Sequence, residues 1–98
     1  MAPERLYFHP SASRDLREAT KRYRERDRDI AADFIKAVDD AIATIVAAPR
    51  RWPVKTRWRR YYLKRFPFTI AFREAGDVIE IGAVAHQKRQ PDYWARGR

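Results

Sequence analysis

The side chains best suited to chemistry lie near the end of the sequence, in the segment AVAHQKRQPDYW at 83–94. An apolar run at 78–85 leads into an imidazole, two cations and two aromatic rings: His86, Lys88, Arg89, Tyr93 and Trp94. Cations and aromatic rings can bind a polyanion, and an imidazole or a phenol can move protons on it. The segment therefore predicts a binding surface or an acid–base site at the exposed end of a buried strand.

The composition predicts one small folded domain spanning residues 1–98. Apolar residues make up 45% and aromatic residues 13%, which is enough to build a core despite the high charge. The chain has no cysteine and two isolated histidines, so we expect neither a metal nor another cofactor. No segment has signal-peptide character or membrane-spanning length, which predicts a cytoplasmic protein without membrane contacts.

The net charge of +9 is confined to one half of the chain. Residues 1–48 contain nine Lys/Arg and nine Asp/Glu, whereas residues 49–98 contain thirteen Lys/Arg and four Asp/Glu. A basic half of this kind predicts a face that meets an anion: nucleic acid, the ribosome or an acidic protein. A basic surface that serves solubility alone is the alternative.

The first half predicts a short strand and two helices that position this face. Residues 5–9 form the strand candidate, which ends at a proline, and Ser11 or Ser13 is expected to cap the first helix. The sign-alternating sequence RERDRD predicts a break, after which a second helix is expected at about 29–48. Two prolines then bracket 49–53, which we expect to be a loop.

The second half predicts a β-sheet. Residues 60–66 and 68–73 alternate between two sets of side chains, as strands do, and 74–77 supply turn residues. The near-continuous apolar run at 78–85 predicts a central strand, in which Gly82 indicates a bulge or a close backbone approach. The order β-α-α-β-β-β predicts an α+β fold, with an antiparallel helical pair on one face of a mainly antiparallel sheet.

Four sequence motifs, in this order, carry a resemblance to a known family: FHPSA, APRRWPV, LKRFPFTIAF and AVAHQKRQPDYW. Together they resemble the RelE/ParE superfamily, the small basic toxins of type II toxin–antitoxin modules. The FPF hairpin with the downstream His-x-x-Arg-x-Pro-x-x-Trp is most similar to the ParE-like, or plasmid stabilisation, branch. The resemblance implies a RelE/ParE-like fold and a toxin that arrests growth until a cognate antitoxin binds it.

RelE-type members of this superfamily are metal-independent endonucleases that cleave mRNA on the ribosome. If the chain had this activity, the resemblance would place it on four residues: Lys64, His86, Arg89 and Tyr93. The sequence departs from the RelE pattern at three positions. Thr69 and Gln87 stand where arginines are expected, and Tyr62 stands where a lysine is expected.

ParE-type members instead inhibit DNA gyrase by binding it, and the departures at Thr69 and Gln87 favour this reading without catalysis. The expected contacts with the target or the antitoxin are aromatic or cationic: Trp52, Arg60, Arg65, Lys88, Arg89, Tyr93 and Trp94. The antitoxin is expected to bring a flexible acidic tail that folds into a groove between the helices and the sheet. Its association with a chain of charge +9 should be fast and sensitive to salt.

Other interpretations stay open. His86 can simply end a strand and bond a carbonyl, and Tyr93 and Trp94 can fold back over the sheet edge. Phe68 reads first as a core residue, and His9 reads as structural. A non-toxic, basic nucleic-acid-binding module is a third function, although no helix-turn-helix, RNP-like or zinc-finger pattern supports it.

Overall fold

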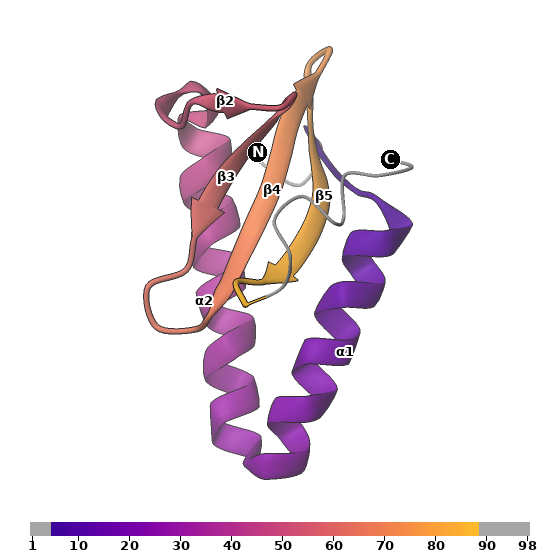
Figure 1. The fold of residues 1–98 in the computed structure, drawn as a ribbon, viewed down its shortest axis with the longest axis vertical. Coiled ribbons are helices and arrows are strands. Elements are labelled where there is room, and N and C mark those ends of the chain that lie inside the picture. The colour runs from indigo at the N-terminus through magenta and orange to yellow at the C-terminus, as the bar shows by residue number, and fades with distance from the viewer. Residues whose placement is uncertain (1–4, 89–98) are drawn as a thin grey trace.

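A computed structural model describes residues 5–88, which form one five-stranded sheet and two long helices (Figure 1). In chain order the elements are β1 (Leu6–Phe8), α1 (Pro10–Arg26), α2 (Arg28–Ala47), the 3-10 helix η2 (Pro49–Arg51), β2 (Val54–Lys55), β3 (Trp58–Tyr62), β4 (Phe68–Ala75) and β5 (Val78–His86). The strands lie in the order β1-β5-β4-β3-β2, and β1 pairs with β5 in parallel, whereas the other pairs are antiparallel. The predicted α+β fold is confirmed, with β2 as an additional strand.

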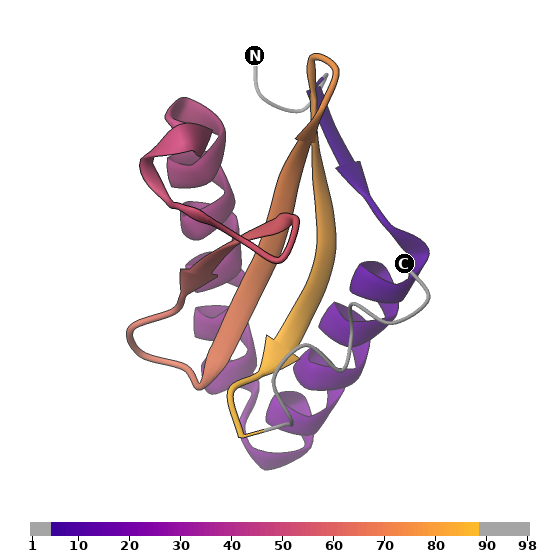
Figure 2. The ribbon, with the colours of Figure 1, turned by 45° about the horizontal axis from the view of Figure 1, so that its top comes forward.

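The two helices form an antiparallel pair against one face of the sheet (Figures 1 and 2). Phe34, Val38 and Ile45 recur along one side of α2 at helical spacing and are fully buried. They pack in one core with the strand residues Ile70 and Ile81. Neither helix of residues 5–88 combines the length and apolar composition that crossing a membrane requires.

The helix boundaries depend on two capping side chains. His9 caps α1, because its Nδ1 accepts a hydrogen bond from the Ser11 N–H at 3.1 Å, so the predicted Ser11 or Ser13 cap is wrong. His9 directly precedes Pro10, the first residue of α1, so its ring nitrogen can accept from the N–H of Ser11, which has no partner within the helix. Ser11 and Ser13 therefore lie inside the helix and do not cap it. Asp27 separates the helices, and its carboxylate accepts hydrogen bonds from two N–H groups of α2 at 2.7 and 3.3 Å.

The strand predicted at 60–66 is displaced toward the N-terminus. The structure has β3 at Trp58–Tyr62, and a loop at 63–67 leads into β4. Leu63 and Phe66 in this loop turn back into the core, and the Leu63 N–H donates to the Phe68 carbonyl at 3.0 Å. Burial of these two loop residues produced an apolar pattern that resembled a longer strand.

The segment predicted as a loop at 49–53 leads into a short hairpin formed by β2 and the start of β3. Lys55 pairs with Trp58, so only Thr56 and Arg57 form the turn. Their φ angles are 59° and 82°, in the left-handed region that such hairpin turns need and that Asn-Gly usually supplies. A β-branched residue in this region is unfavourable, which makes the turn strained.

Gly82 is both a bulge and a point of close backbone approach, the two alternatives that the sequence predicted. Along β5 the register with β4 steps from Ala83 to Ile81, so Gly82 is the extra residue of a β-bulge. A Cβ atom there would lie 2.4 Å from the Trp58 ring, which approaches the backbone closely. Trp58 is only 2% exposed and forms a second, small cluster with alanines of β4 and β5.

Candidate functional site

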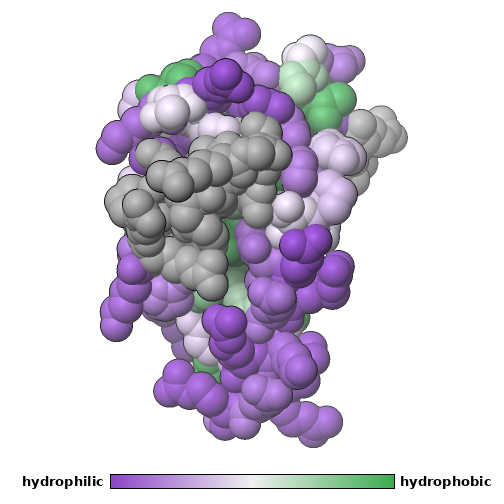
Figure 3. Space-filling model, turned by 45° about the vertical axis from the view of Figure 1, so that its right-hand side comes forward, coloured by the Kyte–Doolittle hydropathy of each residue, from purple (hydrophilic) through white to green (hydrophobic). Residues whose placement is uncertain are grey.

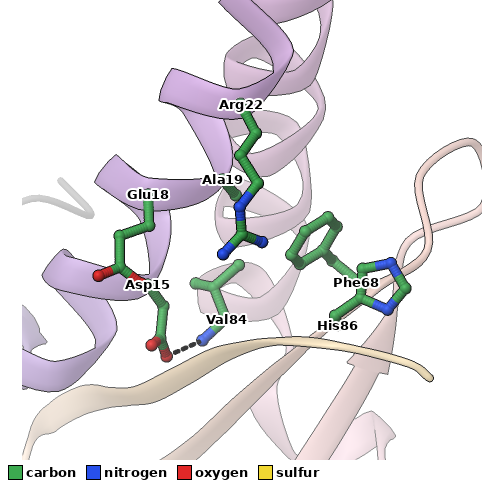
Figure 4. A pocket seen from close by; sticks show the side chains of 7 residues that line it. All are labelled: Asp15, Glu18, Ala19, Arg22, Phe68, Val84 and His86. Atoms are coloured by element: carbon green, nitrogen blue, oxygen red, sulfur yellow. Dashed lines mark hydrogen bonds between the residues drawn. The ribbon is translucent and has the colours of Figure 1, made fainter. Parts of the chain in front are cut away.

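A groove lies where the end of β5 meets α1, and His86 stands at its mouth (Figure 4). His86, the last residue of β5, is paired with Phe68, the first residue of β4. The largest part of the groove is a cavity of about 220 Å³, and its walls combine α1 with the sheet: Ala19, Arg22, Tyr23, Arg26, Phe68 and His86. A smaller part continues along α1 past Asp15 and Glu18 to Val84. We call these two parts together the His86 groove.

Aromatic rings form the floor of the His86 groove. The Phe68 ring lies edge-on to the His86 ring at 5.1 Å and to the Tyr23 ring at 6.3 Å. Phe68 and Tyr23 both contact Phe34 in the main core, at 5.2 and 5.0 Å. The floor is therefore an extension of the core, held in place by packing on several sides.

Cations from α1 lie along one side of the groove. Arg22 and Arg26 are exposed and four residues apart, so they stand on the same side of the helix. In Figure 4 the Arg22 guanidinium points toward Val84 and Phe68. Burial raises the pKa of the Tyr23 phenol above 10.0, and the nearby Arg26 opposes that rise, so Tyr23 is neutral at pH 7.

Asp15 connects α1 to the backbone of β5. The partner strand β1 ends opposite Ile81, and beyond this point the edge of β5 faces the helix. There the Asp15 carboxylate accepts a hydrogen bond from the Val84 N–H at 3.1 Å (Figure 4). Asp15 thus accepts from the Val84 N–H, a backbone donor that would otherwise pair with a neighbouring strand. The position of Asp15 early in the predicted helix did not indicate this role.

The hydrogen bond at His86 fixes its ring. Its Nδ1 accepts from the Lys88 N–H at 3.0 Å, so the neutral imidazole carries its proton on Nε2. The expectation that His86 bonds a carbonyl is therefore wrong at Nδ1, because the partner is a donor. His86 is half-buried and lines the groove, and it is one of the two suggested catalytic residues, with Lys64, that fall within the described part of the chain.

Of the other suggested catalytic residues, the structure describes only Lys64, and it does not lie beside His86. Lys64 is exposed in the loop that follows β3 and is not part of the groove wall. Arg89 and Tyr93 lie outside the described residues. Thr69 pairs with Ala85, and its side chain lies on the face opposite to the His86 groove.

Gln87, the second departure from the RelE pattern, has a structural role. Its side-chain N–H donates to the Phe68 carbonyl at 3.0 Å, and its backbone N–H donates to the Pro67 carbonyl at 2.8 Å. These bonds hold the segment after β5 to the start of β4. Gln87 therefore stabilises the mouth of the groove.

Among residues 5–88, the residues predicted to contact a target or antitoxin lie on different parts of the fold. Trp52 is half-buried and packs edge-on against Tyr61 at 5.2 Å and Phe72 at 6.1 Å, which integrates it into the core. Arg60 is also half-buried, opposite Ala71 on the face away from the helices.

The remaining predicted contacts are at the surface or outside the described residues. Arg65 is exposed and forms an ion pair with Asp33 of α2 at 3.0 Å. Lys88 is exposed beside His86, whereas Arg89, Tyr93 and Trp94 lie outside the described residues. Figure 3 shows the predominantly hydrophilic character of the surface on the α1 side of the molecule, with hydrophobic patches between.

Comparisons with known proteins identify the family. The family model "ParE toxin of type II toxin-antitoxin system, parDE" matches residues 6–91. A solved structure, "Chromosomal ParDE TA system from P. aeruginosa", is similar with a TM-score of 0.73 and 19% identity, over 83% of this chain and 92% of that one. No curated protein matches. With nearly the whole chain matched by one family model, the protein belongs to the ParE toxin family of type II toxin–antitoxin systems.

Proposed function

We propose that this ParE toxin arrests growth by binding and inhibiting DNA gyrase, without catalysis of its own. The gyrase target follows from the similarity to the ParE-like branch. Two observations support the non-catalytic reading: Thr69 and Gln87 stand where RelE-type enzymes have arginines, and Lys64 does not line the groove that His86 lines. An active site for RNA cleavage needs its proton-moving and charge-stabilising groups around one phosphate.

We also propose that the His86 groove receives the acidic tail of a cognate ParD-type antitoxin. The aromatic floor offers a dry surface for an apolar anchor of the tail, and Arg22 and Arg26 stand beside it. A tail with carboxylates next to an apolar side chain would match both features at once. Filling the groove would also cover His86.

Purified chain and relaxed plasmid test the gyrase target directly. We expect the protein to inhibit ATP-dependent supercoiling by gyrase in proportion to its concentration, and added antitoxin to reverse the inhibition. His86→Ala serves as a companion variant, because it removes a suggested catalytic residue that lines the groove. If the chain leaves gyrase unaffected but truncates ribosome-bound mRNA in a manner that depends on His86, the ribonuclease alternative replaces this proposal.

Charge reversal tests the antitoxin site. The double variant Arg22→Glu/Arg26→Glu should slow association with the acidic tail by roughly tenfold or more at low salt. Arg14→Glu/Arg17→Glu is the matched control, because both residues are exposed on α1 and neither lines the groove. Equal slowing by the two double variants would assign the effect to net charge, and the groove would lose its role.

A further inference from the structure

A second cationic surface lies at the other end of the sheet. The sequence contains no carboxylate between Asp40 and Glu74, and six arginines and lysines fall within residues 50–60. These residues form η2, β2 and the start of β3, which cross the top of the molecule in Figure 1. None of them lines the His86 groove.

Two of the six cations hold the hairpin in place. Arg50 and Arg59 both reach Glu74 on β4, at 3.1 and 3.8 Å. Arg51, Lys55 and Arg57 are exposed, and no carboxylate among residues 5–88 lies within ion-pair distance of them. We call these three the hairpin cations. Glu74, the carboxylate that pairs with Arg50 and Arg59, is thus already engaged.

The tryptophans of this segment point inward. Trp52 packs on Tyr61 and Phe72, and Trp58 is buried over Gly82. Protein interfaces take much of their binding energy from Trp, Tyr and Arg anchors, and the two tryptophans of this surface are not available for that role. Contacts with a phosphate backbone require only cations, which this surface presents.

The strained turn adds an independent observation. Arg57 is held at φ 82° next to Thr56 at φ 59°, where neither side chain is favoured. Asn-Gly would form the same turn without strain but would also remove a cation from the hairpin tip. A charged residue in such a conformation fits a position where the charge itself is required.

We infer that the hairpin cations Arg51, Lys55 and Arg57 bind the phosphate backbone of nucleic acid, without reading its sequence. Six residues of β4 separate the level of Phe68 from that of Glu74, which corresponds to roughly 20 Å. The His86 groove and the hairpin surface can therefore be occupied at the same time. The inference depends neither on gyrase as the target nor on capture of the antitoxin in the groove.

Binding of the full chain to a fluorescent 20-base-pair duplex of arbitrary sequence tests this inference, by anisotropy over a series of salt concentrations. We expect the logarithm of the affinity to fall linearly with the logarithm of the salt concentration. Arg51→Gln/Lys55→Gln/Arg57→Gln should weaken binding more than tenfold at low salt and reduce the slope by up to about 2.7, from about 0.9 for each phosphate contact. The control Arg14→Gln/Arg17→Gln/Lys21→Gln removes the same charge from exposed positions on α1 and should stay within about twofold of wild type.

The variant Arg57→Gly separates charge from folding, because glycine accepts the left-handed turn. It should melt at or above the wild-type temperature and still bind DNA more weakly, with a slope reduced by about 1. The inference is overturned if the wild type shows no salt-dependent binding, or if the α1 control loses as much affinity as the hairpin variant. It is also overturned if the hairpin variant loses binding to poly-glutamate but not to DNA, because the surface would then serve an acidic protein.

Discussion

The two ends of the sheet differ in what supports their exposed charges. At the His86 groove, Arg22 and Arg26 stand beside aromatic rings that belong to the main core. At the hairpin, Arg57 stands on a two-residue turn with an unfavourable backbone, and Arg51 and Lys55 precede it on η2 and β2. The groove floor belongs to the main core, whereas the hairpin is anchored by Trp58 in a separate small cluster, by a short ladder and by two ion pairs to Glu74.

This difference determines how substitutions on the two surfaces affect binding and stability. Residues that shape the floor of the groove also stabilise the fold, so binding and stability there are lost together. The exposed cations of the hairpin contribute little to stability, so binding there can be lost alone.

The largest effect is expected for Phe68→Ala, which removes the ring shared by the groove and the core. Phe68 is 6% exposed and contacts Tyr23, Phe34 and His86. Its truncation should lower the free energy of unfolding by about 3–5 kcal/mol, measured by urea denaturation. Phe68→Leu should cost clearly less, because it refills most of the space. A loss below about 1 kcal/mol for the alanine variant would show that the floor is not part of the core.

A smaller loss is expected for Asp15→Ala at the same end. The substitution leaves the Val84 N–H without its carboxylate acceptor, which should lower the free energy of unfolding by about 1–3 kcal/mol. Asp15→Asn retains an acceptor oxygen and should lose less than the alanine variant. Amide hydrogen exchange at Val84 provides the local measurement, since a weakened bond speeds exchange there. Unchanged exchange in Asp15→Ala would contradict this role.

The sequence predicted the core of the fold because periodicity reports burial directly. Phe34, Val38 and Ile45 revealed the buried side of α2, and the apolar run at 78–85 identified β5 as an interior strand. Gly82 was predicted as a bulge or a close approach, and it proved to be both. The motifs that resembled the RelE/ParE toxins led to the family that the comparisons confirmed.

The parts that sequence reasoning missed depend on contacts between distant residues or on backbone conformation. Asp15 and Val84 are 69 positions apart, and nothing in either neighbourhood indicates a bond between them. The turn at Thr56 and Arg57 lacks the Asn-Gly signal, so the sequence did not predict the hairpin between the loop at 49–53 and the strand expected from residue 60. His86 was identified from its position at a strand end, whereas nothing in the sequence singled out Arg22 and Arg26, which come close to it only because α1 packs beside β5.

At the hairpin, relief of strain should increase stability. Thr56→Asn keeps Arg57 and replaces a β-branched residue with one that tolerates the left-handed region, so we expect a gain of about 1 kcal/mol in the free energy of unfolding. DNA binding should remain at the wild-type level, because no cation is lost. Thr44→Asn, at a helical position, is the control and should not stabilise. A destabilised Thr56→Asn would mean that the turn is not strained.

The smallest effect should appear at alkaline pH, and only at the groove end. Because burial raises the pKa of Tyr23 above 10.0 in the folded state, its phenol loses a proton more readily when the chain unfolds. The contribution of Tyr23 to stability is therefore fully present below pH 10 and declines as the pH rises through the folded-state pKa.

Tyr23→Phe should flatten the fall in melting temperature above pH 10, whereas Tyr62→Phe, on a side chain that is 57% exposed, should leave it unchanged. Arg26→Gln removes the cation that lowers the pKa of Tyr23, so the fall in melting temperature should extend to higher pH. Identical alkaline profiles for Tyr23→Phe and wild type would place the phenol in solvent and leave the groove without the dry floor on which an apolar anchor depends.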